Sequence, residues 1–327
     1  MVAPLVEAVA LILEPAPERA RRWAGVVRPG RRRGGRAGRA RRRAHPGTGG
    51  PSTIWHAGAM TVIAVLGAGK IGEALLAGLL QGGRSAEELL FTERHPERAA
   101  ELTERYGIAG VEVAEAAKRA DVLVVAVKPQ DIEPVLAELA PLVGPGSLVV
   151  SLCAGLPTSL YERRLPDGVP VVRVMPNTPM VVGEAMSAVS PGKHATPGHV
   201  ALVKEMLGTV GQVVEVPEAQ QDAVTALSGS GPAYFFFLVE AMIDAGILLG
   251  LPRAVAEKLI IQSAVGAAKM LAETDEHPVI LREAVTSPAG TTINAIRELE
   301  KHGVRAALLA AIEAARDRSV ELGKAHE

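Results

Sequence analysis

The chain has 327 residues, which is long enough for two domains with substantial cores. Its formal net charge of −1 averages a basic start and an acidic remainder: residues 1–59 carry 12 Arg, no Lys and 3 Glu, a net charge of +9, whereas the rest carries a net charge of −10. An acidic body gives no reason to expect nucleic acid as a partner. The single cysteine excludes an intrachain disulfide and a cysteine-based zinc cluster, and it fits a reducing cytoplasm.

Residues 1–59 differ from the rest of the chain. Arginine triplets at 31–33 and 41–43 stand among Gly, Ala and Pro without an apolar period, so the segment cannot bury enough surface to offset its chain entropy. We therefore expect a disordered basic extension, with a nucleic-acid-binding tail as the alternative interpretation. Residues 2–13 make a poor signal peptide, because they lack a basic start and contain a glutamate. Met60 directly precedes the first predicted strand, and we hypothesise that the working protein begins there.

The first predicted unit is a strand, a glycine turn and a helix. Residues 61–66 form a continuous apolar run, typical of a strand covered on both faces, and residues 73–81 have a helical pattern. Gly67 permits the tight turn, Gly69 lets the backbone approach a pyrophosphate, and Gly72 lets helix and strand pack closely. The turn therefore predicts a dinucleotide site. Its predicted cofactor-binding residues are Gly67, Gly69, Lys70, Ile71 and Gly72.

The alternation of strands and helices continues along the chain. Strands are predicted for residues 89–92, 121–127, 147–152 and 171–174, and helices for residues 96–106 and 131–142. This pattern indicates a parallel, doubly wound α/β sheet of the Rossmann type, whose ligands lie beyond the carboxyl ends of the strands. At those ends Lys128 and Asn177 are polar groups available to hold the nicotinamide end of a cofactor. Cys153, at the end of a buried strand, is predicted to be a small core residue rather than a reactive thiol.

The residues after the second predicted strand are expected to read the adenosine ribose. Glu93 lies 21 positions beyond Gly72, where an acid binds a free ribose hydroxyl and favours NAD. Arg94, with Arg98 behind it, would pair with a 2′-phosphate and favour NADP. Both cofactors therefore remain open, and an arginine on a solvated surface is the other interpretation of Arg94.

From residue 220 the pattern changes to long helical stretches, at residues 233–249, 253–273 and 303–323. We predict a dinucleotide-binding domain of residues 60–217 and an all-α substrate and dimerisation domain of residues 218–327. Residues 233–249 are very apolar, but two acidic residues interrupt them and they are shorter than the ~20 residues of a membrane span. No membrane is therefore expected as a partner, and a helix packed in a core or against a second subunit is the better interpretation.

The loop of residues 287–292 combines hydroxyl side chains, a glycine and free backbone N–H groups where a helix should begin. The first N–H groups of a helix lack intrahelical partners and the helix dipole is positive there, so the loop suits a small carboxylate. His277, which precedes Pro278, is predicted to be a structural turn residue rather than an acid or base. No metal-ligand cluster and no Ser-His-Asp signature appears in the sequence, and no metal is expected.

Five ordered motifs resemble those of the pyrroline-5-carboxylate reductases. They are Gly67-x-Gly69-x-x-Gly72, Ala126-Val127-Lys128-Pro129, Arg173-Val174-Met175-Pro176-Asn177-Thr178-Pro179, Leu227-Ser228-Gly229-Ser230-Gly231-Pro232-Ala233-Tyr234 and Thr286-Ser287-Pro288-Ala289-Gly290-Thr291-Thr292. The resemblance runs from about residue 61 to about residue 322, and the last two motifs are the most diagnostic. The sequence departs from the family at Ala289, where members often have Gly, and at Glu93-Arg94-His95, where they often have Asn-Arg-Ser or Asn-Arg-Thr.

The resemblance implies reduction of the ring imine of 1-pyrroline-5-carboxylate to L-proline, the last step of proline synthesis, with NADPH as the first choice of cofactor and NADH as the alternative. It also implies a homodimer, sometimes assembled into larger rings, whose substrate site forms between the nucleotide domain of one subunit and the helical domain of its partner. Carried over by position, Ser287, Gly290 and Thr291 hold the substrate carboxylate. Thr292 also binds the substrate and is the catalytic candidate, because its hydroxyl faces the ring nitrogen. Beyond the glycine turn, the expected cofactor-binding residues are Arg94, Ala126, Lys128 and Asn177.

Two other interpretations remain open from the sequence. A reductase of the β-hydroxyacid dehydrogenase type shares the glycine turn and both domains, but it requires a catalytic lysine in a helix of the second half, and neither Lys258 nor Lys269 lies in such a motif. A non-catalytic NAD(P)-sensing protein would bind the cofactor without turning over an imine.

Overall fold

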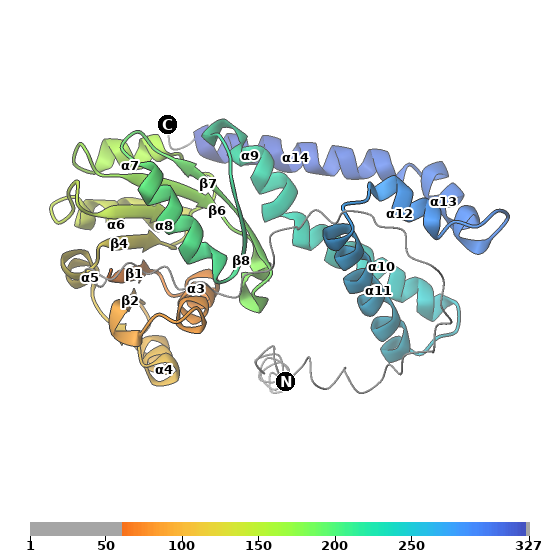
Figure 1. The fold of residues 1–327 in the computed structure, drawn as a ribbon, viewed down its shortest axis with the longest axis horizontal. Coiled ribbons are helices and arrows are strands. Elements are labelled where there is room, and N and C mark those ends of the chain that lie inside the picture. The colour runs from red at the N-terminus through yellow and green to blue at the C-terminus, as the bar shows by residue number, and fades with distance from the viewer. Residues whose placement is uncertain (1–60, 325–327) are drawn as a thin grey trace, which may run out of the picture. The chain divides into compact units, whose positions relative to one another are not determined.

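The computed structural model describes residues 61–324, so the predictions made for residues 1–59 and for a start at Met60 lie outside the described residues. The first half is built on one eight-stranded sheet with the order β3-β2-β1-β4-β5-β6-β7-β8 (Figure 1). The strands are β1 (Ile63–Leu66), β2 (Leu89–Thr92), β3 (Ala109–Gly110), β4 (Val122–Val125), β5 (Leu148–Ser151), β6 (Val171–Met175), β7 (Ala185–Pro191) and β8 (Gly211–Glu215).

The sheet is parallel from β3 to β6 but not at its other edge. Strand β7 pairs antiparallel with β6, and β8 pairs parallel with β7. A parallel partner of β6 would need a crossover of about a dozen residues or more. The chain instead turns back through the short 3-10 helix Thr178–Val182 and Gly183, which has a φ of +74°. The prediction of a wholly parallel sheet is therefore wrong at this edge.

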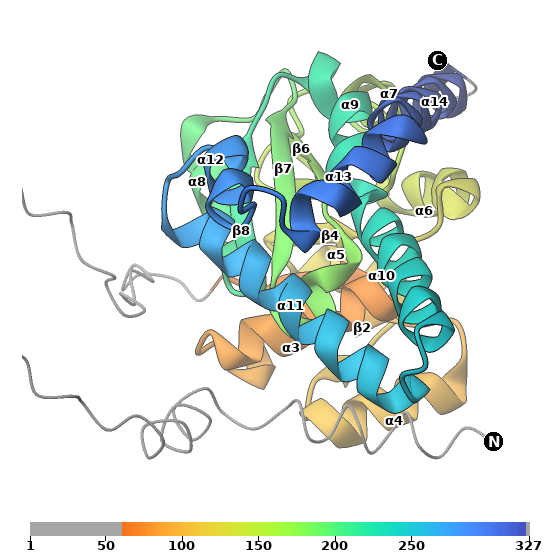
Figure 2. The ribbon, with the colours of Figure 1, turned by 90° about the vertical axis from the view of Figure 1, so that its right-hand side faces the viewer.

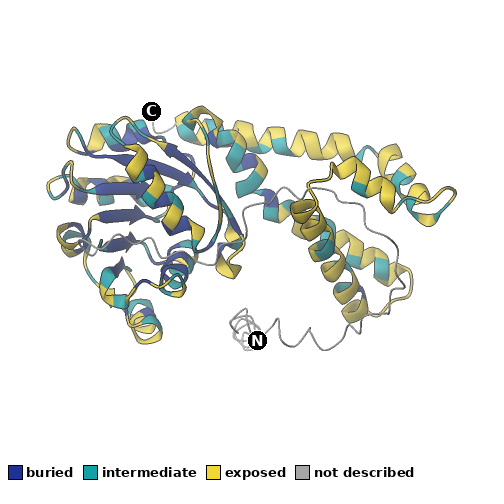
Figure 3. Cartoon of the chain, in the orientation of Figure 1, coloured by how far each residue is buried: buried dark blue, intermediate teal, exposed yellow. Residues whose placement is uncertain are grey.

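Helices cover both faces of the sheet, as the doubly wound prediction requires. They are α3 (Lys70–Gln81), α4 (Pro96–Tyr106), α5 (Val113–Arg119), α6 (Ile132–Leu139), α7 (Thr158–Arg164) and α8 (Pro197–Gly208). Successive residues of a strand point to opposite faces. Ile63 and Val65 of β1 accordingly join one core cluster with α3 and α8, whereas Ala64 and Leu66 join a second with α5, α6 and α7. Figure 3 shows the strands as the buried centre of this half.

The second half is helical. Its elements are α9 (Gln221–Val224), a π-helical turn (Thr225–Gly229), α10 (Gly231–Leu248), α11 (Arg253–Glu273), α12 (Pro278–Ala284), α13 (Thr291–Lys301) and α14 (Val304–Lys324). Helices α10 and α11 lie side by side as a hairpin in both views (Figures 1 and 2). Helix α12 contacts α11, and α13 contacts α14.

Helix α14 connects α13 back to the sheet. Near its C-terminal end Ser319 Oγ lies 2.7 Å from Asp222 Oδ1 of α9. A Cβ placed on Gly323 would lie 3.3 Å from the carbonyl oxygen of Gly155, which follows β5. At 1.5 Å per residue, the helix is about 30 Å long. The sheet and α13 therefore lie at opposite ends of a long rod.

One helical path, Glu218–Leu248, is 31 residues long and apolar enough by length and composition to cross a membrane. The prediction that this region is too short for a span is therefore wrong, because the helical path begins before residue 233. Only 6% of its most apolar window is buried, and the consecutive Phe235, Phe236 and Phe237 are 67%, 68% and 70% exposed. The single chain thus leaves the apolar surface of α10 uncovered.

Candidate functional site

The glycine turn connects β1 to α3 and is hydrogen-bonded to the carboxyl end of β2. Gly67 has a φ of +98°, which an L side chain rarely adopts. Its N–H donates to Thr92 Oγ1 at 3.1 Å, and the N–H of Ala68 donates to the Thr92 carbonyl at 3.0 Å. Thr92 at the end of β2 therefore holds the turn in place.

The two later glycines have different surroundings. A Cβ on Gly72 would lie 2.3 Å from the carbonyl oxygen of Gly67, so a side chain does not fit at this position without a shift of the backbone. A Cβ on Gly69 would meet no heavy atom within 4 Å, so the space above it is open. Gly69 caps α3 without a side-chain hydrogen bond, and the helix begins at Lys70 and Ile71 with free N–H groups. These features fit a dinucleotide pyrophosphate at the start of α3.

The two arginines that follow β2, Arg94 in the loop and Arg98 in α4, have different partners. Arg94 is 77% exposed and its Nη2 lies 3.1 Å from Asp131 Oδ2. An exposed ion pair is worth at most about 1 kcal/mol, so Arg94 can exchange this partner for a phosphate. Arg98 instead pairs with Glu73 of α3 and with Glu101. Support of a 2′-phosphate by Arg98 would require these ion pairs to rearrange, and it stays a prediction.

The end of β4 lies next to the glycine turn. The N–H of Ala126 donates to the Leu66 carbonyl at 2.8 Å, and the Ala126 carbonyl oxygen would lie 3.0 Å from a Cβ on Gly67. Lys128, at the start of the short 3-10 helix Pro129–Asp131, is exposed. The structure thus brings Ala126 beside Gly67, as a shared ligand edge requires.

Cys153 lies just beyond β5 and is buried. Its Sγ lies 3.3 Å from the carbonyl oxygen of Val127, to which the thiol donates. Burial raises the pKa of the Cys153 thiol, so the thiolate is disfavoured. The prediction of a core residue is confirmed.

Asn177 follows β6, and both ends of its amide are engaged within the chain. Its Oδ1 accepts a hydrogen bond from the N–H of Met186 at 2.9 Å, and its Nδ2 donates to the Ser228 carbonyl at 3.2 Å. A cavity of about 400 Å³ adjoins it. The cavity is lined by Asn177, Pro179, Leu227, Ser228, Gly231, Pro232, Phe235 and Phe236.

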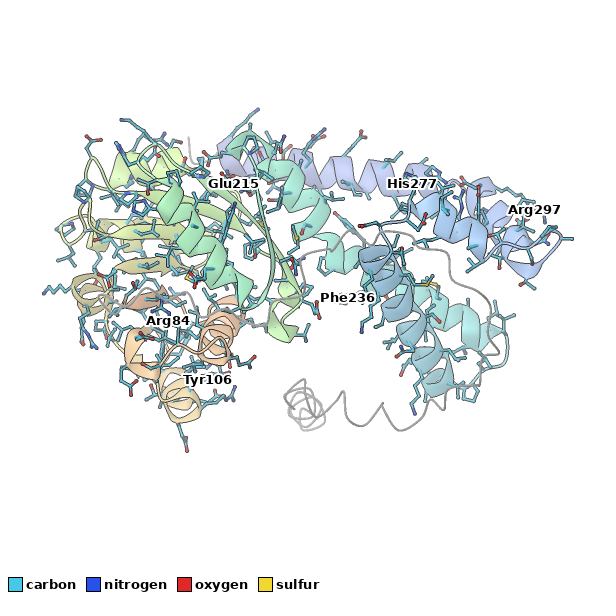
Figure 4. The ribbon with its side chains drawn as sticks, in the orientation of Figure 1. Arg84, Tyr106, Glu215, Phe236, His277 and Arg297 are labelled. Atoms are coloured by element: carbon cyan, nitrogen blue, oxygen red, sulfur yellow. The ribbon has the colours of Figure 1, made fainter. Side chains whose placement is uncertain are left out.

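The two phenylalanines were not among the predicted site residues. The signal available in the sequence was their rarity, since aromatic residues make up only 3% of the chain and three phenylalanines stand together here. Figure 4 labels Phe236 near the start of α10.

The loop of residues 287–292 leads into α13. Gly290 caps the helix without a side-chain hydrogen bond and Thr291 begins it, so the first N–H groups of α13 are free of partners within the helix. Ala289 has a φ of +56°, in the left-handed region. A Cβ on Gly290 would lie 2.4 Å from Ser287 Oγ, so a larger residue there would displace the Ser287 side chain. Ser287 and Thr291 are exposed and Thr292 is half-buried.

The loop and the glycine turn lie in different parts of the chain. The loop opens α13, which packs against α14, and it is the other end of that long helix that contacts the region of Asp222 and Gly155. Figure 1 shows α13 at the end of α14 away from the sheet. One chain therefore does not bring the two predicted anion sites together.

His277 caps α12. Its Nδ1 accepts a hydrogen bond from the N–H of Val279 at 3.3 Å, which confirms it as a structural turn residue (Figure 4). Within residues 61–324 no group of three or more His, Cys, Asp or Glu side chains is arranged to hold a metal ion.

A glycine turn with open space at the start of a helix, on the ligand edge of a doubly wound sheet, defines a dinucleotide-binding protein of the Rossmann class. The family model "NADP oxidoreductase coenzyme F420-dependent" matches residues 62–155, and the model "Pyrroline-5-carboxylate reductase dimerisation" matches residues 218–322. The chain belongs to the pyrroline-5-carboxylate reductase family. A member from Corynebacterium melassecola is 49% identical over 269 residues, which cover 81% of this chain and 100% of that protein.

Other members agree in sequence and fold. The pyrroline-5-carboxylate reductase of Mycobacterium tuberculosis is 44% identical over 286 residues, covering 80% of this chain and 97% of the relative. The structure from Coxiella burnetii has a TM-score of 0.77 at 35% identity, covering 81% of this chain and 99% of its own. The Plasmodium falciparum enzyme, crystallised with NADP bound, has a TM-score of 0.73 at 29% identity over 80% of this chain and 98% of its own. The resemblance found in the sequence is confirmed.

Proposed function

We propose that this chain reduces the ring imine of 1-pyrroline-5-carboxylate to L-proline with NAD(P)H, which makes it the last enzyme of proline synthesis. Family membership supports this reaction. The observation in the fold that carries the proposal is a pair of uncapped helix starts in one chain. Gly69 caps the start of α3 and has open space beside it. Gly290 caps the start of α13, and exposed hydroxyl groups lie next to it.

The chain's own residues have two tasks at the substrate. The first N–H groups of α13, at Gly290 and Thr291, and the hydroxyl of Ser287 hold the carboxylate. The Thr292 hydroxyl hydrogen-bonds the ring nitrogen, where the electron pair of the C=N bond collects and becomes the amine lone pair. The nitrogen is protonated by water before the reaction, so no strong acid or metal is required.

The remaining residues hold the cofactor. The free N–H groups at the start of α3 bind the pyrophosphate, with Gly67, Gly69 and Gly72 keeping the backbone close. Arg94 reaches the ribose phosphate, and Ala126 and Lys128 border the nicotinamide end. When bound, the reduced nicotinamide would supply the hydride for the imine carbon, and these residues would contribute mainly by orienting it toward the substrate.

The assembly follows from the separation of the two sites. Since α14 holds the 287–292 loop away from its own sheet, the loop completes the site of a second copy. A homodimer or a larger homo-oligomer also covers the exposed phenylalanines of α10. We place the enzyme in the cytoplasm, with a nucleotide domain of residues 60–217 and a helical domain of residues 218–327. Neither nucleic acid nor a membrane is assigned as a partner.

Coupled assays test the proposal directly. Purified enzyme is given 1-pyrroline-5-carboxylate with NADPH or NADH side by side, and both cofactor oxidation and proline are measured, with a panel of hydroxy acids as the control. We expect turnover only with the imine and a preference for NADPH that Arg94→Ala reduces. Cofactor binding without proline formation would identify a sensing protein instead.

A further inference from the structure

The passage from the sheet half to the helical half contains a local change of helix type. The path from α9 to α10 is not a continuous α-helix but includes the π-helical turn Thr225–Gly229. In this turn the N–H of Ser230 donates a hydrogen bond to the Thr225 carbonyl at 2.8 Å. A π turn frees backbone carbonyl groups and often marks a functional position. What binds those carbonyl groups decides how rigid the turn is.

Two side chains donate hydrogen bonds to carbonyl groups of this turn. The Tyr234 hydroxyl donates to the Ala226 carbonyl at 2.9 Å, which closes the turn from the side of α10. Asn177 Nδ2 donates to the Ser228 carbonyl at 3.2 Å, which closes it from the side of the sheet. The π turn is therefore held from both ends rather than left as a loose hinge.

Asn177 links three elements with one amide group. It stands directly after β6, its Oδ1 binds the N–H of Met186 in β7, and its Nδ2 binds the π turn. On the same side the end of the Met175 side chain packs against Gly229, where a Cβ would lie 2.4 Å from Met175 Cε. Asn177 therefore joins the π turn to the ligand edge of the sheet.

The segment before the π turn is anchored to the sheet independently. The Glu218 carboxylate accepts hydrogen bonds from the N–H and the hydroxyl of Thr158, each at 2.7 Å. It also forms an ion pair with Arg173 at 3.3 Å. Buried Gln221 donates through Nε2 to Ser190 Oγ at 2.8 Å. These side-chain anchors end before the turn. The turn itself packs against α14, and α10 beyond it contacts the turn and α11. The direction in which α10 leaves the sheet is therefore set at the π turn.

We infer that Asn177 is a positioning residue for hydride transfer, because it holds the π turn from which α10 starts and against which α14, the helix that carries α13, also packs. This inference rests on the proposed function, in which a cofactor on the sheet and a substrate on the helical half of a partner must meet. A misplacement of about 1 Å can cost a hundredfold in rate. The engaged amide of Asn177 differs from that of a direct cofactor ligand, whose polar atoms face the cofactor.

Three variants test this role. Asn177→Asp is isosteric and keeps the oxygen that accepts from Met186, but it loses the donor to Ser228; Asn177→Ser removes both bonds with a small polar residue. Thr209→Val is the matched control, because it removes a side-chain hydrogen bond of 2.7 Å to the Met206 carbonyl at the end of α8, outside the π turn. Each variant is measured for melting temperature, Kd for NADPH, kcat with the imine and the primary isotope effect with deuterated NADPH.

We expect both Asn177 variants to bind NADPH within about twofold of the wild type and to remain dimeric, while kcat falls about ten- to a hundredfold and the isotope effect rises. The control should lose melting temperature without a change in kcat. A Kd raised more than about tenfold with an unchanged kcat would make Asn177 a cofactor ligand, and unchanged kinetics with lower stability would make it purely structural; either result overturns the inference. If the wild type forms no proline at all, the proposed function fails instead.

Discussion

Ala289 has a left-handed backbone conformation that favours glycine. At a φ of +56° an L residue costs about 1–2 kcal/mol. Glycine relieves this cost but adds about 0.5–1 kcal/mol of chain entropy in the unfolded state. The two effects nearly cancel, so we expect Ala289→Gly to change the free energy of unfolding by less than about 1 kcal/mol.

Ala289→Val should behave differently, because a β-branched residue in this region is a true outlier. We expect it to distort the 287–292 loop and to raise the KM for the imine at least about tenfold, equivalent to about 1.4 kcal/mol, while the Kd for NADPH stays unchanged. Steady-state kinetics and calorimetry on the two variants give the comparison. Equal KM values for the glycine and valine variants would show that the loop conformation does not matter for substrate binding.

The buried pair Cys153 and Tyr161 makes stability depend on alkaline pH. Burial raises the pKa of both groups, so both stay protonated in the folded chain. The unfolded chain releases the thiol proton near its ordinary pKa of 9.0, and the tyrosine proton near 10.0. Their contribution to stability is therefore complete below about pH 9 and is lost as the pH rises further. Urea titrations between about pH 8 and pH 10 should show this decline, with a shallower decline in Cys153→Ala; equal slopes would remove the thiol from the explanation.

At the scale of an element, two glycines of the β1–α3 unit have different roles. Gly72 is required for packing, and Gly69 is expected to be required for cofactor binding. Gly69→Ala and Gly72→Ala add the same methyl group, but only the second meets a backbone oxygen, at 2.3 Å. We expect Gly72→Ala to lose about 1–3 kcal/mol of stability through overpacking. Gly69→Ala should melt like the wild type and yet bind NADPH at least about tenfold more weakly, because its methyl enters the space for the pyrophosphate. Thermal melts and calorimetry check both, and a stable Gly72→Ala variant would contradict the packing argument.

The elements that the sequence predicts well are those whose cause is local. Strands β1 and β4 are continuous apolar runs buried on both faces. Helix α4 starts at Pro96 and is capped at its C-terminal end by Gly107, which has a φ of +69°. Strand β7 was missed because its buried positions include Ser187 and Ser190, which give no apolar period. The helical path through the π turn was underestimated because Gly229, Gly231 and Pro232 look like breakers in the sequence.

The candidate site divides in the same way. The glycine turn and the start of α13 could be predicted, since both depend on residues adjacent in sequence. The bond from Asn177 to Ser228 spans 51 positions and the ion pair from Arg94 to Asp131 spans 37, and no local pattern encodes such contacts. The predicted roles of the individual site residues therefore stay predictions, to be tested by substitution.

The whole molecule carries more apolar surface than one chain covers. Helix α10 is mostly apolar, and Phe235, Phe236, Phe237 and Leu248 are exposed on it. Apolar helix surface of this kind is normally buried, so a second copy is the natural cover in a family with a dimerisation domain. The same assembly solves a geometric problem, because α14 keeps the substrate loop of each chain away from its own glycine turn.

A mixing experiment tests whether each site is shared between two chains. Gly69→Val disables the cofactor side of a chain, and Thr292→Ala disables its catalytic hydroxyl, so each variant alone should be nearly inactive. In a heterodimer of the two, one site combines both defects, but the other pairs an intact glycine turn with an intact loop from the partner. Random exchange should therefore restore about a quarter of wild-type activity. Different affinity tags on the two variants confirm that heterodimers form. Inactive heterodimers would place both halves of the site within one chain, and the long α14 would then have to bend to bring them together.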